Sequence, residues 1–178
     1  MIETKRLVLR PYVLADYQPY LAMCSDPVVV RFLGGRPFSP EDAWNRVMRY
    51  AGHWSLLSHG LFAVLKKDTG EYVGETGIAD FCRGLGDSFD GFGEASWTFA
   101  SRVHGLGFAF EATEAAHKWY NESVSQDRTV CLVDPDNTAS LKMAGRLGYI
   151  PFDKGTYKNH SMIMLERKHP LSQITAYS

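Results

Sequence analysis

The stretch Arg102–Ala112, with the sequence RVHGLGFAFEA, decides the fold more than any other part of this 178-residue chain. Two glycines, Gly105 and Gly107, precede an amphipathic helical pattern. A helix start leaves backbone N–H groups unpaired and carries the positive end of the helix dipole, so it attracts phosphate oxygens. Glycines there keep side chains out of the way. The stretch predicts a phosphate-binding turn that opens a helix; an ordinary glycine-containing loop before a helix is the alternative on this segment alone.

The bulk composition fits one ordinary globular domain. A formal net charge of −1 provides no long-range field to gather nucleic acid or an anionic membrane. No apolar run reaches membrane-spanning length and no secretory leader is evident, so we expect a cytoplasmic protein. The cysteines Cys24, Cys82 and Cys131 show no paired spacing, which favours buried free thiols over disulfides or a metal site.

Hydrophobic periodicity and turn residues predict an alternating order of elements. Ser39, followed by Pro40 and two acidic residues, marks the start of a helix that ends before Gly60, and Gly148 suits a left-handed helix cap. The full order is a strand (6–10), helices (14–24 and from 40), strands (61–65, 72–78 and 92–99), a helix (to about 121), a strand (129–133), a helix (to 147) and two strands (149–152 and 161–165). We therefore expect one α/β domain over 1–168 with a mixed sheet, and a C-terminal tail over 169–178.

Three segments agree in order and spacing with one family. Thr4-x-Arg6-Leu7-x-Leu9-Arg10 starts the chain, Arg102-x-x-Gly105-x-Gly107 follows a strand, and Asn137-Thr138-Ala139-Ser140 opens a helix that closes with Leu147-Gly148-Tyr149. Together they resemble the GCN5-related N-acetyltransferases, the GNAT family, and within it the ribosomal-protein N-terminal (alanine/serine) acetyltransferases. The resemblance covers about residues 3 to 167. Ser101, Phe108 and Phe110 depart from the usual residues of the pattern, but leave its main-chain phosphate site intact.

The resemblance implies a mostly antiparallel central sheet, flanked by about four helices, in which two central strands splay apart in a V. These strands are 94–99 and 129–133. Acetyl-CoA is implied as the cosubstrate, lying in the V without any metal. The resemblance implies that the backbone of Trp97, Thr98 and Phe99 pairs with the pantetheine arm. It implies that the diphosphate is bound by the backbone amides of Val103, His104, Gly105, Leu106, Gly107 and Phe108, and that Arg102 reaches a phosphate. Asn137 and Ser140 are implied to face pantetheine and the thioester sulfur.

Two residues are candidates for proton transfer. Many relatives carry a tyrosine at the position of Ala144, and the N-terminal-acetylating subgroup tends to lack it, so the resemblance assigns protonation of the departing thiolate to Ser140. Tyr149 and Tyr157 are further candidates. Glu94 is our first candidate for the general base, directly or through water, and Glu75 the second.

Each candidate has a structural alternative. Glu94 could be a structural carboxylate bonded across strands, and Ser140 could merely satisfy a helix N–H. Asn137 could be no more than the N-cap, although that role does not exclude contact with the cofactor. We expect the side chain of His104 to point to solvent. Asp87 and Asp90, in the loop 83–91, could form an acidic lip that attracts a cationic amine.

The resulting hypothesis is an enzyme that moves an acetyl group from acetyl-CoA to a primary amine, in a monomer or homodimer that binds neither nucleic acid nor membrane. A protein or peptide N-terminus is the favoured acceptor. A small-molecule amine (a polyamine, an amino acid or an antibiotic) is the first alternative. A non-catalytic acyl-CoA-binding module is the second, because Ala144 replaces the tyrosine.

Overall fold

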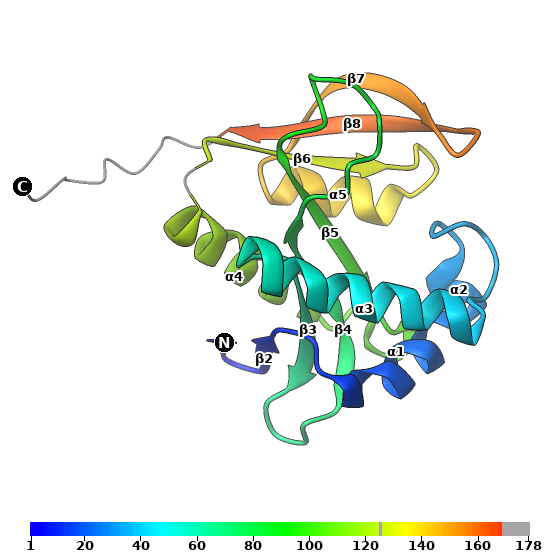
Figure 1. Ribbon diagram of the computed structural model, residues 1–178, viewed down its shortest axis with the longest axis vertical. Coiled ribbons are helices and arrows are strands. Elements are labelled where there is room, and N and C mark those ends of the chain that lie inside the picture. Colours follow the sequence, from blue (N-terminus) through cyan, green and yellow to red (C-terminus); the bar gives the residue numbers. More distant parts are fainter. Residues whose placement is uncertain (125, 169–178) are drawn as a thin grey trace, which may run out of the picture.

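One eight-stranded sheet organises the chain in a computed structural model that describes residues 1–124 and 126–168 (Figure 1). The expected tail over 169–178 lies outside the described residues. The strands are β1 (Ile2–Glu3), β2 (Leu7–Arg10), β3 (Leu61–Lys66), β4 (Tyr72–Ala79), β5 (Gly93–Phe99), β6 (Arg128–Val133), β7 (Ile150–Tyr157) and β8 (His160–Lys168). The helices are α1 (Tyr17–Cys24), α2 (Pro27–Val30), α3 (Pro40–Leu57), α4 (Phe108–Ser123) and α5 (Thr138–Arg146), with short 3-10 turns at η1 (Leu14–Asp16) and η2 (Ser101–Val103).

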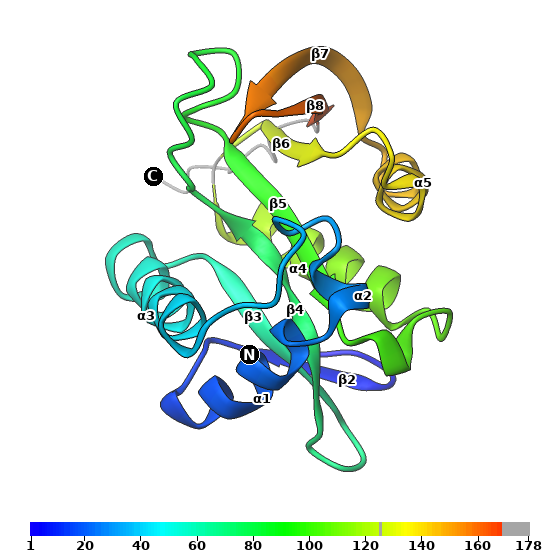
Figure 2. The same ribbon diagram turned by 90° about the vertical axis from the view of Figure 1, so that its right-hand side faces the viewer.

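The sheet has the order β1-β2-β3-β4-β5-β6-β8-β7, and every neighbouring pair except β5 and β6 is antiparallel. The parallel pair is joined only at Gly93 with Thr129 and at Glu94 with Val130. Beyond Glu94 the two strands separate, and β5 links the part of the sheet that holds β2 to β4 with the part that holds β6 to β8 (Figures 1 and 2). The expected mixed sheet with a central splay is therefore confirmed.

The alternation of side chains along β4 assigns the helices to two faces. Glu75 accepts a hydrogen bond from Tyr50 of α3, whereas the next residue, Thr76, pairs its hydroxyl with Thr113 of α4. Successive side chains of a strand point to opposite faces, so α3 and α4 cover opposite sides of the sheet. Trp97, the register partner of Thr76 on β5, contacts Ser140 of α5. Helices α4 and α5 therefore share one face, and α3 lies on the other (Figure 2).

The local signals in the sequence act as expected at the helix ends. The Ser39 hydroxyl accepts the Asp42 N–H at 3.0 Å, and the Asp42 carboxylate accepts the Ser39 N–H in return, which makes a capping box. Gly148, with φ +87°, directly follows Leu147, the C-cap of α5, and ends the helix in the left-handed region. Within the described residues, no helix is long and apolar enough to cross a bilayer.

Two local expectations need correction. The last hairpin is longer than its apolar residues indicate, because β7 and β8 extend through a polar stretch to a tight turn between Tyr157 and His160. Cys24 and Cys131 are buried as expected, but Cys82 is exposed. Cys82 belongs to the irregular segment after β4, where no packed element covers it.

Candidate functional site

A turn with two left-handed glycines joins β5 to α4, and residues 102–107 are called the glycine turn below. Gly105 has φ +78° and Gly107 has φ +79°, a region that glycine enters without the steric cost of a Cβ. A Cβ built at Gly105 would meet no atom within 4 Å, so the space beside it is open. Gly107 is also the N-cap of α4. The free N–H groups at the start of α4 therefore adjoin an open surface that could receive an anion.

Hydrogen bonds within the turn narrow the expected set of phosphate-binding amides. The Val103 N–H donates to Ala100, the His104 N–H to Ser101, and the Leu106 N–H to Val103, at 3.0–3.3 Å. These three amides already have partners, because the 3-10 turn η2 closes on itself. Among the described residues, the amides of Gly105, Gly107 and Phe108 have no such bond and remain the available donors of the cradle.

Residues of the N-terminal motif bind the glycine turn and the first turn of α4, and the sequence did not predict these contacts. The Glu111 carboxylate in α4 accepts hydrogen bonds from the Thr4 hydroxyl, at 2.6 Å, and from the backbone N–H and Nε of Arg6. Arg6 also donates to the Leu106 carbonyl at 2.8 Å and lies 4.4 Å from the Phe108 ring centroid. We call Thr4, Arg6 and Glu111 the clamp, since they fix the turn to the edge of the sheet.

The other polar side chains of the turn are held by the sheet. The Arg102 Nε pairs with Glu71 at 2.7 Å, and its guanidinium also donates to the Tyr72 carbonyl. With these bonds in place, Arg102 could bind a phosphate only through the N–H groups that Glu71 and Tyr72 leave unused. His104 is exposed, in line with the expectation that it points to solvent, and its Nε2 donates to the Phe99 carbonyl at 2.9 Å.

Within residues 1–124 and 126–168, the β6-facing edge of β5 beyond Glu94 has no partner strand. Trp97, Thr98 and Phe99 pair with β4 on one side, while β6 pairs with β5 only as far as Glu94. Backbone N–H and C=O groups in such a position need a partner, and an extended ligand can supply one as an added strand would. This edge leads directly into the glycine turn, so one ligand could span both.

The start of α5 faces this free edge. Asn137 caps the helix, and its side-chain oxygen accepts the Ser140 N–H at 3.1 Å. The Ser140 hydroxyl in turn accepts a hydrogen bond from the Trp97 indole at 3.3 Å. The capping alternative therefore holds for Asn137, whereas the Ser140 side chain lies between α5 and β5, at the opening of the splay.

Glu94 is buried on the α3 side of the sheet in a two-point ion pair. Both carboxylate oxygens accept N–H groups of Arg83 at 2.6 Å. Burial raises the pKa of Glu94, although the Arg83 guanidinium opposes this by favouring the charged form. Glu94 therefore has the surroundings of a structural carboxylate, because it is bonded to an arginine of the loop after β4. An amine could reach Glu94 only beside that arginine.

Glu75, the second candidate base, lies in a cluster of tyrosines. It is 1% exposed and accepts hydrogen bonds from Tyr12 at 2.8 Å and from Tyr50 at 3.2 Å. Tyr12 also shares a 2.8 Å hydrogen bond with Tyr72. Burial raises the pKa of Glu75 against the effect of these bonds. The cluster is a closed network, and its carboxylate has no exposed approach.

The remaining candidates separate into core and surface positions. The Tyr149 hydroxyl is buried between His117 and Thr129 at 2.8 Å from each, so it belongs to the core. The Tyr157 ring lies 4.7 Å from the Arg83 guanidinium on the α3 side. Asp90 accepts hydrogen bonds from the backbone N–H groups of residues 83–86 and so organises its own loop. Of the two acids expected to form an acidic lip, only Asp87 is then left to attract a cationic amine.

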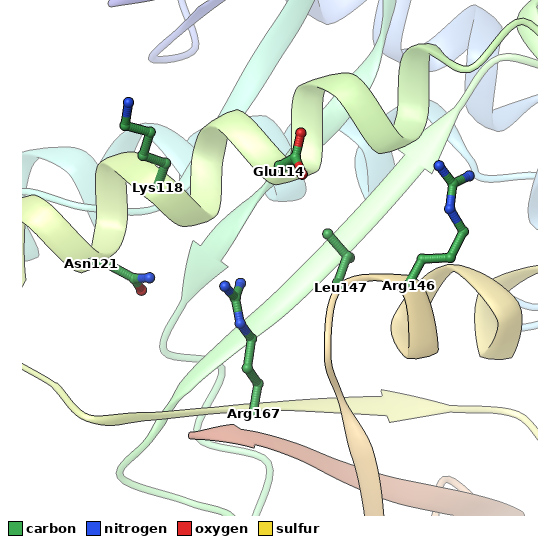
Figure 3. A pocket seen from close by; sticks show the side chains of 6 residues that line it. All are labelled: Glu114, Lys118, Asn121, Arg146, Leu147 and Arg167. Atoms are coloured by element: carbon green, nitrogen blue, oxygen red, sulfur yellow. The ribbon is translucent and has the colours of Figure 1, made fainter. Parts of the chain in front are cut away.

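A pocket of about 310 Å³ lies farther along α4, between α4, the end of α5 and β8. Arg167 of β8 and Arg146 of α5 extend toward α4 in Figure 3. The residues that line the pocket are Glu114, Lys118, Asn121, Arg146, Leu147 and Arg167. No candidate residue from the sequence lines it, because its members come from three separate elements. Across residues 1–124 and 126–168, no three or more His, Cys, Asp or Glu side chains group as metal ligands.

Comparisons with known proteins agree with this arrangement. The model of the acetyltransferase (GNAT) domain matches residues 6–150. The uncharacterized N-acetyltransferase p20 of Bacillus licheniformis is 26% identical over 147 residues, which are 82% of this chain and 80% of that protein.

Two solved structures are similar over nearly their whole length. A GNAT-family acetyltransferase of Bordetella pertussis superposes with a TM-score of 0.84 at 32% identity, covering 93% of this chain and 98% of that one. The ribosomal-protein-S5-alanine acetyltransferase of Vibrio fischeri shares the fold, with a TM-score of 0.74 at 16% identity, covering 94% and 95%. With its splayed sheet and glycine turn, the chain belongs to the GNAT family of acetyltransferases.

Proposed function

We propose that this protein transfers the acetyl group of acetyl-CoA to a primary amine by direct attack, and that the favoured acceptor is a protein or peptide N-terminus. The observation that carries the proposal is the unpaired edge of β5, which runs without a break into the glycine turn. An extended thioester with a diphosphate matches both parts, since the edge offers strand-like hydrogen bonds and the turn offers free amides.

The main chain does most of the binding in this proposal. Trp97, Thr98 and Phe99 pair with the pantetheine arm, and the amides of Gly105, Gly107 and Phe108 bind the diphosphate. The clamp keeps these amides in place. Backbone donors of this kind are pre-oriented, so little ordering is required when the ligand binds.

Ser140 is the proposed proton donor to the departing sulfur. Its hydroxyl lies against Trp97 at the opening of the splay, while Asn137 satisfies its backbone N–H. Ala144, which stands at the position of the family tyrosine, is fully buried and has no proton to give. Tyr149 is engaged with His117 and Thr129 in the core, which favours Ser140 over it.

The acceptor amine determines how much help from a base is required. A peptide α-amine with a pKa near 7.7–8.0 loses its proton at neutral pH for about 1 kcal/mol, whereas a lysine near 10.4 requires about 4–5 kcal/mol. A strong base is thus dispensable for a peptide N-terminus. In this proposal Glu94 accepts the proton through a water, because Arg83 already bonds both of its oxygens.

The proposal is tested by measuring the release of free thiol from acetyl-CoA in the presence of different amines. The three acceptors are a peptide with a free N-terminus, an N-terminally blocked peptide with one lysine, and a polyamine. We expect the first to react fastest. Ser140→Ala should lower turnover by about 100-fold or more, the usual contribution of a general acid, with acetyl-CoA affinity unchanged. Thr138→Ala is the matched control, because Thr138 is an exposed hydroxyl in the same helical turn.

Three results would redirect the proposal. Binding of acetyl-CoA without thiol release from any amine would favour the acyl-CoA-binding module. Equal turnover by the Ser140→Ala variant would remove that hydroxyl from the reaction. A polyamine that reacts faster than the peptide would favour the small-molecule alternative.

A further inference from the structure

The acceptor must approach from the α3 side of the sheet, if the coenzyme lies as proposed. Helices α4 and α5 cover the face on which the coenzyme is proposed to lie, so an acceptor would reach the gap between β5 and β6 from the opposite face. Glu94 projects on that opposite face, since Trp97, three positions later on β5, projects toward α5. The groups around Glu94 are therefore those that an acceptor would meet.

Two arginines and three aromatic rings surround this position. The Phe81 ring lies between the guanidinium of Arg49, 5.2 Å from its centroid, and that of Arg83, at 4.9 Å. The Arg83 guanidinium also lies over Tyr157, and that of Arg49 lies 5.5 Å from the Tyr50 centroid. Stacking on rings restricts a guanidinium to one plane, which orients its N–H donors.

Two of the acids nearby already have partners. Arg83 holds Glu94, and Asp90 is bonded to the backbone of its own loop. Asp80 lies 3.7 Å from His59. In contrast, the Arg49 guanidinium has neither a carboxylate within ion-pair distance nor a hydrogen-bond acceptor within the described part of the chain.

We propose that Arg49 binds an anionic group of the acceptor, so that the substrate is a primary amine carrying a carboxylate or phosphoryl group on the same molecule. A guanidinium presents a planar fork of N–H donors that matches the oxygens of a carboxylate or a phosphate. The same charge repels a second ammonium group, which disfavours polyamines. This inference rests on the proposed function and specifies its acceptor.

Matched acceptors test the charge separately from size. The peptide pair Ser-Glu-amide and Ser-Gln-amide differs by one carboxylate, and the pair O-phosphoethanolamine and ethanolamine differs by one phosphoryl group. We expect kcat/KM to favour the anionic member of at least one pair by about tenfold or more, the effect of one charge-assisted hydrogen bond. The pair that shows the preference distinguishes a peptide from a small phosphorylated amine.

The variant Arg49→Met keeps an unbranched stem against Phe81 and removes the charge. It should raise KM for the anionic acceptor by about tenfold and leave KM for the neutral acceptor and for acetyl-CoA unchanged. Arg146→Gln is the matched control, because Arg146 likewise stacks on a ring, at 3.8 Å from the Phe110 centroid, but lies on the other face. It should leave the preference intact.

Separate outcomes overturn the two proposals. Thiol release with equal kcat/KM for both members of both pairs contradicts the role of Arg49 and leaves the acetyltransferase proposal standing. So does an equal loss for both members in Arg49→Met. Absence of thiol release with every amine contradicts the proposed transfer itself.

Discussion

Replacement of Gly105 by alanine measures what the bare glycine turn contributes to coenzyme binding. At φ +78°, with no atom within 4 Å of the new Cβ, the variant loses no packing. The folded state should lose only the cost of a left-handed backbone in a residue with a side chain, about 1–2 kcal/mol. The methyl group would, however, occupy the surface that the phosphates approach.

The chain provides a close control for this experiment. Gly70 has φ +72° and open space around its Cβ, and it lies in the hairpin between β3 and β4. The next residue, Glu71, contacts the turn only through the Arg102 side chain and not through the amides that the phosphates would reach. Gly70→Ala should therefore lose the same stability, as urea unfolding of both variants would show. Any difference between the two variants in coenzyme binding then reports on the turn alone.

The size of the effect follows from the hydrogen bonds at risk. One amide bond to a charged oxygen contributes about 1.5–3 kcal/mol, so losing it should raise the Kd for CoA by about 10- to 100-fold. Isothermal titration calorimetry would measure this rise for Gly105→Ala and an unchanged Kd for Gly70→Ala. Equal affinities in the two variants would refute the placement of the diphosphate at this turn.

Three further predictions concern the supports of the site. Glu111→Ala should raise the Kd for CoA by about tenfold, because the hydrogen bonds of the clamp no longer fix the turn. Lys67→Met, which breaks an exposed ion pair with Glu3, is the control and should leave this Kd unchanged. Equal affinities of the two variants would show that the clamp does not contribute to coenzyme binding. Burial raises the pKa of Glu75 in the folded protein, so its contribution to stability is present below the unfolded pKa and declines as pH rises through the folded pKa. Thermal unfolding should therefore show that the Glu75→Gln variant is more stable than wild type at neutral pH and that this difference shrinks toward pH 4. A difference that stays constant with pH would contradict a raised pKa for Glu75. Tyr149→Phe should cost about 1–3 kcal/mol, because two buried partners lose a hydrogen bond, without changing turnover per folded molecule; lower turnover at unchanged stability would instead make Tyr149 a proton donor.

The elements that the sequence predicted well are those whose causes lie within a few residues. Ser39 caps α3 through Asp42, three residues away, and Gly148 ends α5 by its own backbone conformation. The existence of the glycine turn, which positive φ at Gly105 and Gly107 requires, was also readable from the chain. The order of strands and helices followed from periodicity, which depends only on which side chains face the core.

The roles of individual side chains were less predictable, because their partners are distant in the sequence. Glu94 was a natural candidate for a base, but its pairing with Arg83 through both carboxylate oxygens, which limits it to acting through a water, could not be read from the sequence. Asp90 was a candidate for an acidic lip, but its carboxylate turns inward to its own loop. In both cases the path of the irregular segment after β4 decides the outcome, and no periodic pattern encodes that path.

The sequence by itself determined the alternation of strands and helices, the capped helix ends and a bare turn before α4, since these depend on local propensity and backbone freedom. Only the tertiary structure decided that Thr4 and Arg6 meet Glu111 across more than a hundred residues and that Trp97 reaches Ser140. It also decided that Arg49 has no carboxylate within ion-pair distance among the residues that the structure describes. Contacts of this kind arise when packing of the sheet brings separate elements together, so their geometry is fixed by the whole fold and not by any one segment.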